Sequence, residues 1–294
     1  MIGPELLDNP ALGTTMIFKT LGDAEDGVWM FRTMHQISQL SQAAALSSSD
    51  RAEFDAAHKL LFECMRQSND ARHELWRLIE QHVKDISEGN AVVAGSRGVI
   101  SVLQDFEPPL NRAVNSFFAS SRTALYHLFG QRDDPSSGSH SRTAAEILTG
   151  DNLSFVHAKK DTTFEAEAKK FLDKHPGQPS AHLIDILRSD RTSWTLGLQE
   201  IRDKIIHDTT HEPLRMLYQA RGQKVAIGFP RLNGVELLDF VEMFWNNLVD
   251  ATEEIILACI AIRLPAFMAI VPIPEGRRDQ ELPYRWQAVI LPNP

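Results

Sequence analysis

The sequence predicts an all-α protein: an antiparallel helical bundle with an N-terminal helical extension and a short proline-rich C-terminal tail that forms a β-hairpin. Apolar residues recur at intervals of three and four over several long stretches, which is the spacing of a buried helix face. The chain shows no alternation of strands with helices of the kind that builds a parallel sheet. With 294 residues, 43% of them hydrophobic, it has enough apolar side chains for a substantial core.

The N-terminal region, residues 1–96, is expected to hold two helices. Residues 28–46 carry apolar side chains at helical spacing. A second helix is expected after residues 47–50 (Ser-Ser-Ser-Asp), whose side chains suit a helix N-cap, and it runs toward Ile86. The Ser-Asn-Asp sequence at residues 68–70 is expected to interrupt this second helix.

The central region, residues 97–264, is expected to form the bundle itself. A glycine-containing connection over residues 89–98 leads into it. Ser180 is expected to cap one further helix. Four more helical stretches follow from the periodicity: 110–129, 163–174, 193–208 and 235–264.

The C-terminal tail, residues 265–294, begins at Pro265 and contains further prolines that exclude a long helix. Residues 267–271 and 285–291 are apolar and β-prone, so we expect them to pair as a small edge hairpin. Residues 223–229 form another short β-prone stretch.

Charge and cysteine content set limits on partners and compartment. The formal charge of −9 gives no overall attraction to nucleic acid, so RNA binding needs a local basic patch. Residues 151–204 hold nine basic and nine acidic residues, which indicates either an RNA-facing strip or a mixed-charge surface. Cys64 and Cys259 lie in apolar helical patterns, typical of buried thiols in a reducing compartment. Without a secretory pattern or a membrane-length apolar run, a cytoplasmic protein is expected.

One short segment carries the candidate chemistry. Arg202 stays charged at any accessible pH, and His207 exchanges a proton near neutrality. Together they provide the minimum set of groups for cleaving a phosphodiester without a metal ion. Asp203 lies one helical turn before His207 and can accept a hydrogen bond from its imidazole. The alternative interpretation is an ordinary Asp–His surface pair beside a solvated arginine.

The same spacing, or one with six intervening residues, recurs elsewhere, so spacing alone does not select the site. The competing pairs are Arg66 with His73, Arg77 with His82, and Arg122 with His127. The last two pairs lie within predicted helices, where they are interpreted as ordinary helix surface or partly buried polar residues.

A zinc-binding site is the second chemical interpretation of this segment. His207 and His211 enclose Asp-Thr-Thr, which is close to the H-E-x-x-H pattern that places two imidazoles on one helix face. Asp208 replaces the glutamate of that pattern, and no third ligand is evident. We therefore expect neither a metal nor another cofactor.

Residues 201–207 resemble the motif of the HEPN superfamily, all-helical domains that carry an arginine, a polar residue and, after four to six intervening positions, a histidine. Asp203 occupies the polar position, where asparagine is commonest. Residues 115–125 are similar to the first core helix of such domains, and residues 235–264 fit the long helix after the motif. The resemblance covers residues 97–264.

The resemblance implies a function. Many HEPN domains cleave RNA without metal, usually as dimers that bring two motifs into one cleft. Arg202 would then bind the scissile phosphate, His207 would move the proton, and Asp203 would support it. RNA, a second copy of the chain, and an antitoxin or regulatory protein are the implied partners, in a toxin–antitoxin or phage-defence setting. Other members have lost activity, so a noncatalytic binding or scaffolding module is the alternative.

Overall fold

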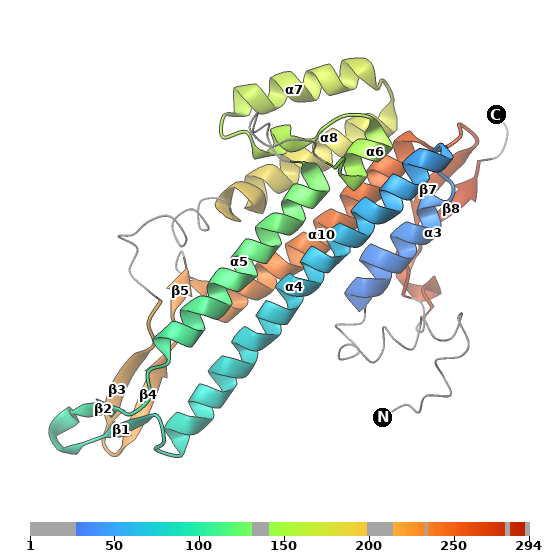
Figure 1. The fold of residues 1–294 in the computed structure, drawn as a ribbon. Helices are drawn as coiled ribbons and strands as arrows, with labels where there is room; N and C mark the ends of the chain where they lie inside the picture. The colour runs from blue at the N-terminus through green and yellow to red at the C-terminus, as the bar shows by residue number, and fades with distance from the viewer. Residues whose placement is uncertain (1–27, 131–140, 199–213, 233–234, 280–282, 292–294) are drawn as a thin grey trace. The chain divides into compact units, whose positions relative to one another are not determined.

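The computed structural model describes residues 28–130, 141–198, 214–232, 235–279 and 283–291. Within these residues helices dominate, as the sequence predicts, and short antiparallel hairpins join or flank them (Figure 1). The described residues form four two-stranded hairpins, whereas the prediction named one, in the C-terminal tail. None of the described helices has both the length and the apolar character needed to cross a membrane.

The chain divides into two compact units. Unit 1 comprises Met1–Phe62, His127–Asp190 and Val249–Pro294, and unit 2 comprises Glu63–Tyr126 and Arg191–Leu248. Each unit therefore combines residues from more than one of the three regions expected from the sequence. The long helices α4, α5 and α10 each contribute residues to both units.

Helix α4 spans Ser48–Ser87 without a break. Ser47 caps it, because the backbone N–H of Asp50 donates to Ser47 Oγ at 3.1 Å. The interruption expected from the Ser-Asn-Asp sequence does not occur. Ser68 Oγ donates to the carbonyl oxygen of Cys64 at 3.1 Å, one turn earlier. Because this hydroxyl bonds inside the helix, it does not draw the backbone into a turn.

Unit 1 holds the N-terminal helical residues, a group of short helices and the C-terminal hairpin. Helices α7 and α8 lie side by side (Figure 1). Helix α8 begins two residues before Ser180, which is buried in its first turn, so the predicted cap is wrong. The elements, besides parts of α4, α5 and α10, are η2 (Phe31–Gln36), α3 (Ile37–Ser41), α6 (Ala144–Thr149), η4 (Ser154–His157), α7 (Asp161–Lys174), α8 (Gln178–Asp190), β7 (Met268–Pro272), η6 (Glu275–Arg277) and β8 (Trp286–Ile290).

The C-terminal hairpin forms where the sequence predicts it. Strands β7 and β8 are antiparallel, with Met268 opposite Ile290 and Pro272 opposite Trp286. The sequence signal is two apolar, β-prone stretches separated by a proline-containing segment.

A buried carboxylate holds three parts of unit 1 together. Glu253, on helix α10 (Leu237–Ile262), has no exposed surface. It accepts hydrogen bonds from Arg32 Nε at 2.8 Å and Gln36 Nε2 at 2.7 Å, and Arg285 Nη1 lies 3.2 Å away. The amide oxygen of Gln36 accepts from the backbone N–H groups of Arg285 and Trp286 at 2.6 and 3.0 Å. This network, which we call the Glu253 cluster, links residues 31–36 and β8 to α10.

The π-helical turn η2 has a second anchor. The carbonyl oxygen of Thr33 lies 2.6 Å from Nε2 of the buried His58 on α4. Burial lowers the pKa of His58, although its bond to Thr33 opposes that shift. A neutral imidazole can donate this bond to the Thr33 carbonyl oxygen, which ties η2 to α4.

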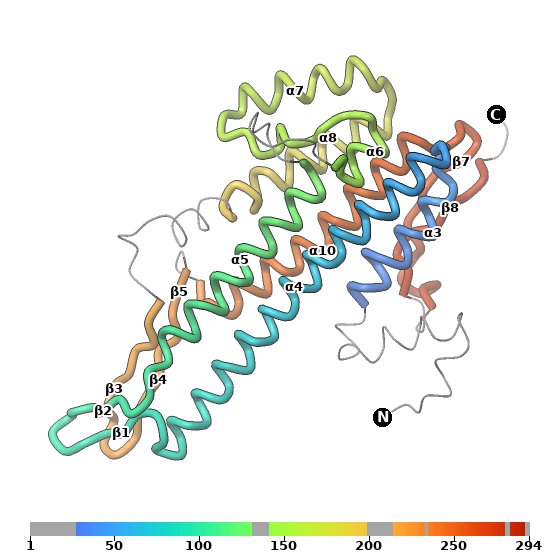
Figure 2. Tube along the Cα trace, viewed as in Figure 1, coloured from blue at the N-terminus to red at the C-terminus, as the bar shows by residue number. Residues whose placement is uncertain are grey.

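Unit 2 is built on helices and hairpins that follow one another along the chain. In Figure 2 the trace runs down α4, turns through the β1–β2 hairpin and returns along α5. The connection expected at residues 89–98 therefore contains a strand, β1. The elements, besides parts of α4 and α10, are β1 (Val92–Ala94), η3 (Ser96–Gly98), β2 (Ile100–Val102), part of α5 (Glu107–Phe129), η5 (Arg191–Thr195), β3 (Leu217–Arg221), β4 (Lys224–Gly228), β5 (Arg231–Leu232) and β6 (Val235–Glu236).

A small apolar cluster joins the hairpins of unit 2 to α4. Ile86, Ala91 and Val92 are buried at its centre. Partly buried side chains of β2, β3 and β4 cover them. These are Ile100, Tyr218, Val225 and Ile227. Two-stranded hairpins are marginal alone in water, so this shared cluster accounts for their order.

Candidate functional site

The sequence-predicted site residues Arg202, Asp203 and His207 lie outside the described residues, as does the candidate zinc ligand His211. The structure therefore neither brings these side chains together nor separates them.

The described residues on either side of this segment are both buried in unit 2. Leu198 is 1% exposed and Leu214 is 7% exposed. The backbone N–H of Leu214 donates to Asn111 Oδ1, and its carbonyl oxygen accepts from Asn111 Nδ2, both at 3.1 Å. Asn111 thus fixes the chain to α5 directly after the segment.

The competing pair Arg77 and His82 does not form a reactive arrangement. Arg77 donates two hydrogen bonds to Glu74, at 2.7 and 2.6 Å, on the exposed surface of α4. His82 is 2% exposed and stacks on Phe106, with ring centroids 4.0 Å apart. Its Nε2 lies 2.7 Å from the hydroxyl oxygen of Tyr218. The arginine and the histidine therefore serve separate structural contacts.

Side chains of the remaining arginine–histidine pairs also make contacts within the fold. Arg66 bonds to Glu63 at 3.1 Å and Asp70 at 2.9 Å on the surface of α4. The guanidinium of Arg122 lies over the ring of Tyr126, 4.9 Å from its centroid. His127 is half-buried, and burial lowers its pKa.

The His82–Tyr218 pair predicts a pH dependence of stability. Burial lowers the pKa of His82, while Asp85 opposes the shift, and burial raises the pKa of Tyr218 to about 12. Both groups are therefore neutral at pH 7. A histidine whose folded pKa is lowered gives its full stabilising contribution above the unfolded pKa of about 6.5 and loses it as the pH falls toward the folded value.

We expect the free energy of unfolding of the wild-type protein to fall between pH 7 and pH 5. His82→Gln keeps a polar group near Tyr218 but cannot titrate, so its stability should fall less over that range. Urea unfolding at several pH values measures both slopes. The exposed His182→Gln is the control and should keep the wild-type slope. Equal slopes in the wild type and His82→Gln would contradict this assignment.

Three of the seven basic residues in the possible RNA-facing strip pair with acids. Lys170 bonds to Glu167, and Lys174 bonds to Asp151, both at 2.6 Å. Arg188 donates to both Glu165 and Asp185. Arg191 is 2% exposed. These contacts support the mixed-charge interpretation of this surface. Lys159, Lys160 and Lys169 belong to the same predicted strip.

The part of the chain that the structure describes contains no group of three or more histidine, cysteine, aspartate or glutamate side chains placed to hold a metal. Cys64 and Cys259 are buried free thiols, as expected from their apolar settings. Burial raises the pKa of both, which keeps them protonated and unreactive at neutral pH.

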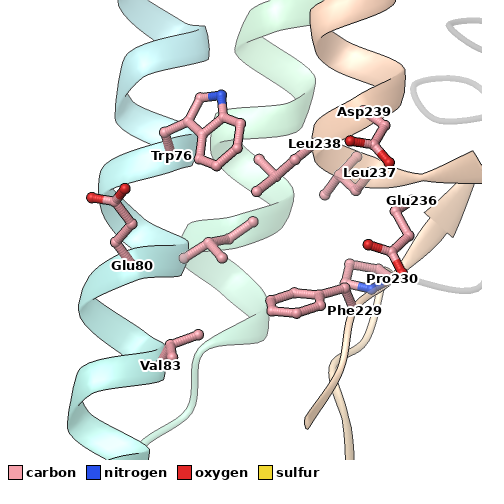
Figure 3. Close-up of a pocket in the computed structure, with 10 residues that line it drawn as sticks. Trp76, Glu80, Val83, Phe229, Pro230, Glu236, Leu237, Leu238 and Asp239 are labelled. Atoms are coloured by element: carbon pink, nitrogen blue, oxygen red, sulfur yellow. The ribbon is translucent and has the colours of Figure 1, made fainter.

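Unit 2 contains an apolar pocket that could bind a ligand. Its volume is about 430 Å³, within the range that holds a small organic molecule. Helix α4, the residues after β4, strand β6 and the first turn of α10 line it (Figure 3). The lining residues are Trp76, Ile79, Glu80, Val83, Phe229, Pro230, Glu236, Leu237, Leu238 and Asp239.

Hydrogen bonds fix two walls of the pocket. Trp76 Nε1 donates to Glu242 Oε1 at 2.6 Å, and Glu242 Oε2 accepts from Arg72 at 2.8 Å. The indole is thereby held in one orientation. The backbone N–H of Leu237 donates to the carbonyl oxygen of Pro230 at 2.9 Å, which holds the start of α10 against the end of the β4 segment.

Sequence reasoning missed this pocket because its walls come from parts of the chain that are far apart in sequence. One wall is the stretch of α4 that begins at Trp76, and the other walls come from residues 229–239. The available signal was local: Phe229-Pro230 is an aromatic residue at a turn, and Asp239 is an acid in a first helical turn. Neither feature alone distinguishes a ligand site from ordinary folding.

Comparison with known proteins adds no relative. No family model matches the chain, and neither a curated protein sequence nor a solved structure matches it. The HEPN resemblance therefore stays a prediction from residues 201–207 and their helical setting.

Proposed function

We propose that this chain is a cytoplasmic helical protein of HEPN type that cleaves RNA without a metal ion, acting as a homodimer. The proposal rests on the Arg-Asp-Lys-Ile-Ile-His sequence at residues 202–207. One observation favours this motif over its competitors: Arg77 and His82 are engaged in separate structural contacts.

The proposed reaction uses the RNA's own 2′-hydroxyl as the nucleophile. His207 accepts the 2′-hydroxyl proton as that oxygen attacks phosphorus, and the bond to the 5′-oxygen breaks. The leaving oxygen takes up a proton, from water or from the second copy's imidazole. The products are a 2′,3′-cyclic phosphate and a 5′-hydroxyl. Arg202 binds the phosphate oxygens and stabilises their developing charge, and Asp203 orients His207.

The test is cleavage of labelled RNA by the purified protein in excess chelator. We expect wild-type protein to yield 2′,3′-cyclic phosphate ends and Arg202→Ala to yield none. Arg77→Ala is the matched control, because it removes an exposed arginine that pairs with Glu74 on the same helix. Equal cleavage by wild type and Arg202→Ala would show a contaminating nuclease and would refute the proposal.

A noncatalytic binding module is the second candidate, and the apolar pocket of unit 2 favours it. On this reading Arg202 and His207 have no catalytic role. An absence of RNA cleavage combined with specific ligand binding to the pocket would favour this candidate over the nuclease.

A further inference from the structure

The unit 2 pocket combines an apolar interior with an acidic rim. Its apolar walls include the rings of Trp76 and Phe229, which Figure 3 shows at different ends of the cavity. Glu80 comes from the α4 side, and Glu236 and Asp239 come from the opposite side (Figure 3). None of the ten lining residues is basic.

The described residues place little compensating positive charge beside the acidic rim. Arg231 forms an ion pair with Glu236 at 3.7 Å, and both side chains are about half exposed or more, so this pair is weak. The N-terminus of α10 contributes a partial positive charge of about +0.5 near Asp239. Counting the described residues alone, three carboxylates set against one arginine and this partial charge give the rim a net negative charge.

We propose that this pocket binds a small organic cation with an aromatic or branched apolar body. The body fills the cavity against Ile79, Val83 and Leu238, and the ammonium group lies at the rim. A cation there gains from the carboxylates, and it also gains from the fixed indole face of Trp76, since ring faces attract ammonium groups. An anionic ligand of the same shape is repelled by the rim. This site is separate from the proposed nuclease motif.

Dansylcadaverine is the probe, because it joins an aromatic body to one primary ammonium group and its emission shifts to the blue in apolar surroundings. Its N-acetylated form has the same body without the charge. We expect dansylcadaverine to bind saturably to the full chain with a blue shift. We expect the acetylated form to bind about tenfold more weakly, as loss of a partly desolvated cation contact predicts.

Substitutions separate the two parts of the site. The triple variant Glu80→Gln, Glu236→Gln and Asp239→Asn should bind both probes with similar affinity. The charge-matched control is Glu63→Gln, Glu74→Gln and Glu88→Gln, which removes one partly exposed and two exposed acids outside the pocket and should keep the tenfold preference.

Filling the cavity tests its location. Val83→Phe should remove binding of both probes, and Leu238→Phe serves the same purpose if Val83→Phe does not fold by circular dichroism. The proposal is overturned if wild-type protein shows no saturable binding or equal affinity for the two probes. It is also overturned, in favour of a protein partner, if a dansylated basic peptide binds and dansylcadaverine does not. None of these readouts depends on RNA cleavage.

Discussion

Replacing Glu253 by alanine is expected to lower the free energy of unfolding of unit 1 by about 3–5 kcal/mol, the usual cost of removing one partner from a buried ion pair. Arg32, whose side chain is 13% exposed, would lose its fully buried partner. Burial lowers the pKa of Arg32, but Glu253 and then Asp250 outweigh that effect and raise it overall. The guanidinium therefore stays charged in the variant and is left with Asp250. Urea unfolding at pH 7 measures the loss.

Two further variants separate charge from hydrogen bonding in the Glu253 cluster. Glu253→Gln keeps an acceptor for Arg32 and should cost less than alanine. Asp250→Asn is the matched control, because the Asp250 side chain is 49% exposed, and its loss should cost no more than about 1 kcal/mol. In hydrogen exchange, Glu253→Ala should lose protection in residues 31–41 before the rest of unit 1. A change of under about 1 kcal/mol for Glu253→Ala would show that the cluster does not stabilise the fold.

The Glu253 cluster also shows where sequence reasoning ends. The periodicity of residues 235–264 predicts helix α10 and its apolar face, since those signals are local. The sequence does not separate Glu253 from the nearby acids Asp250 and Glu254, and only the structure shows that Glu253 is buried. Its partner Arg32 is 221 residues away, and no local pattern identifies that pairing. Burial first, and the charge of Asp250 second, raise the pKa of the neighbouring Glu254.

The errors in the secondary structure have the same physical origin. A Ser-Asn-Asp sequence favours a turn when its side chains bond to the local backbone, but Ser68 makes an intrahelical bond and α4 continues. The glycines at residues 89–98 predict a connection, yet Val92 and its neighbours pair with residues 100–102 over the buried Ile86. In both places, bonding and packing that the local sequence does not specify decide the outcome.

The two candidate sites differ in how far the sequence predicts them. The Arg202–His207 motif is a local pattern, so the sequence identifies it, but its geometry lies outside the described residues. The unit 2 pocket differs in both respects, because the structure describes it and no local sequence pattern predicts it. Its geometry is described, but Trp76 and Phe229 meet only through the fold of unit 2. A ligand site assembled from distant segments leaves no spacing signature in one sequence.

Replacing His207 by alanine is expected to lower the rate of RNA cleavage by about 10²–10⁴-fold, the usual contribution of a general base. The loss should appear in kcat with little change in KM, because the imidazole acts on the proton in the transition state and not on ground-state binding. His182→Ala, which removes an exposed histidine of α8, is the matched control and should retain the wild-type rate. A His207→Ala rate within about threefold of wild type would exclude this residue as the base.

Asp203 provides the pH test of the same proposal. A carboxylate one turn before His207 favours the charged imidazolium and so raises its pKa. In Asp203→Asn this pKa falls, so the limb of the kcat/KM profile that reports His207 should move to lower pH. Glu275→Gln, whose side chain is 89% exposed, is the control and should leave the profile in place. An unmoved profile in Asp203→Asn would mean that Asp203 does not contact His207, and the proposed positioning role would then be wrong even if cleavage is real.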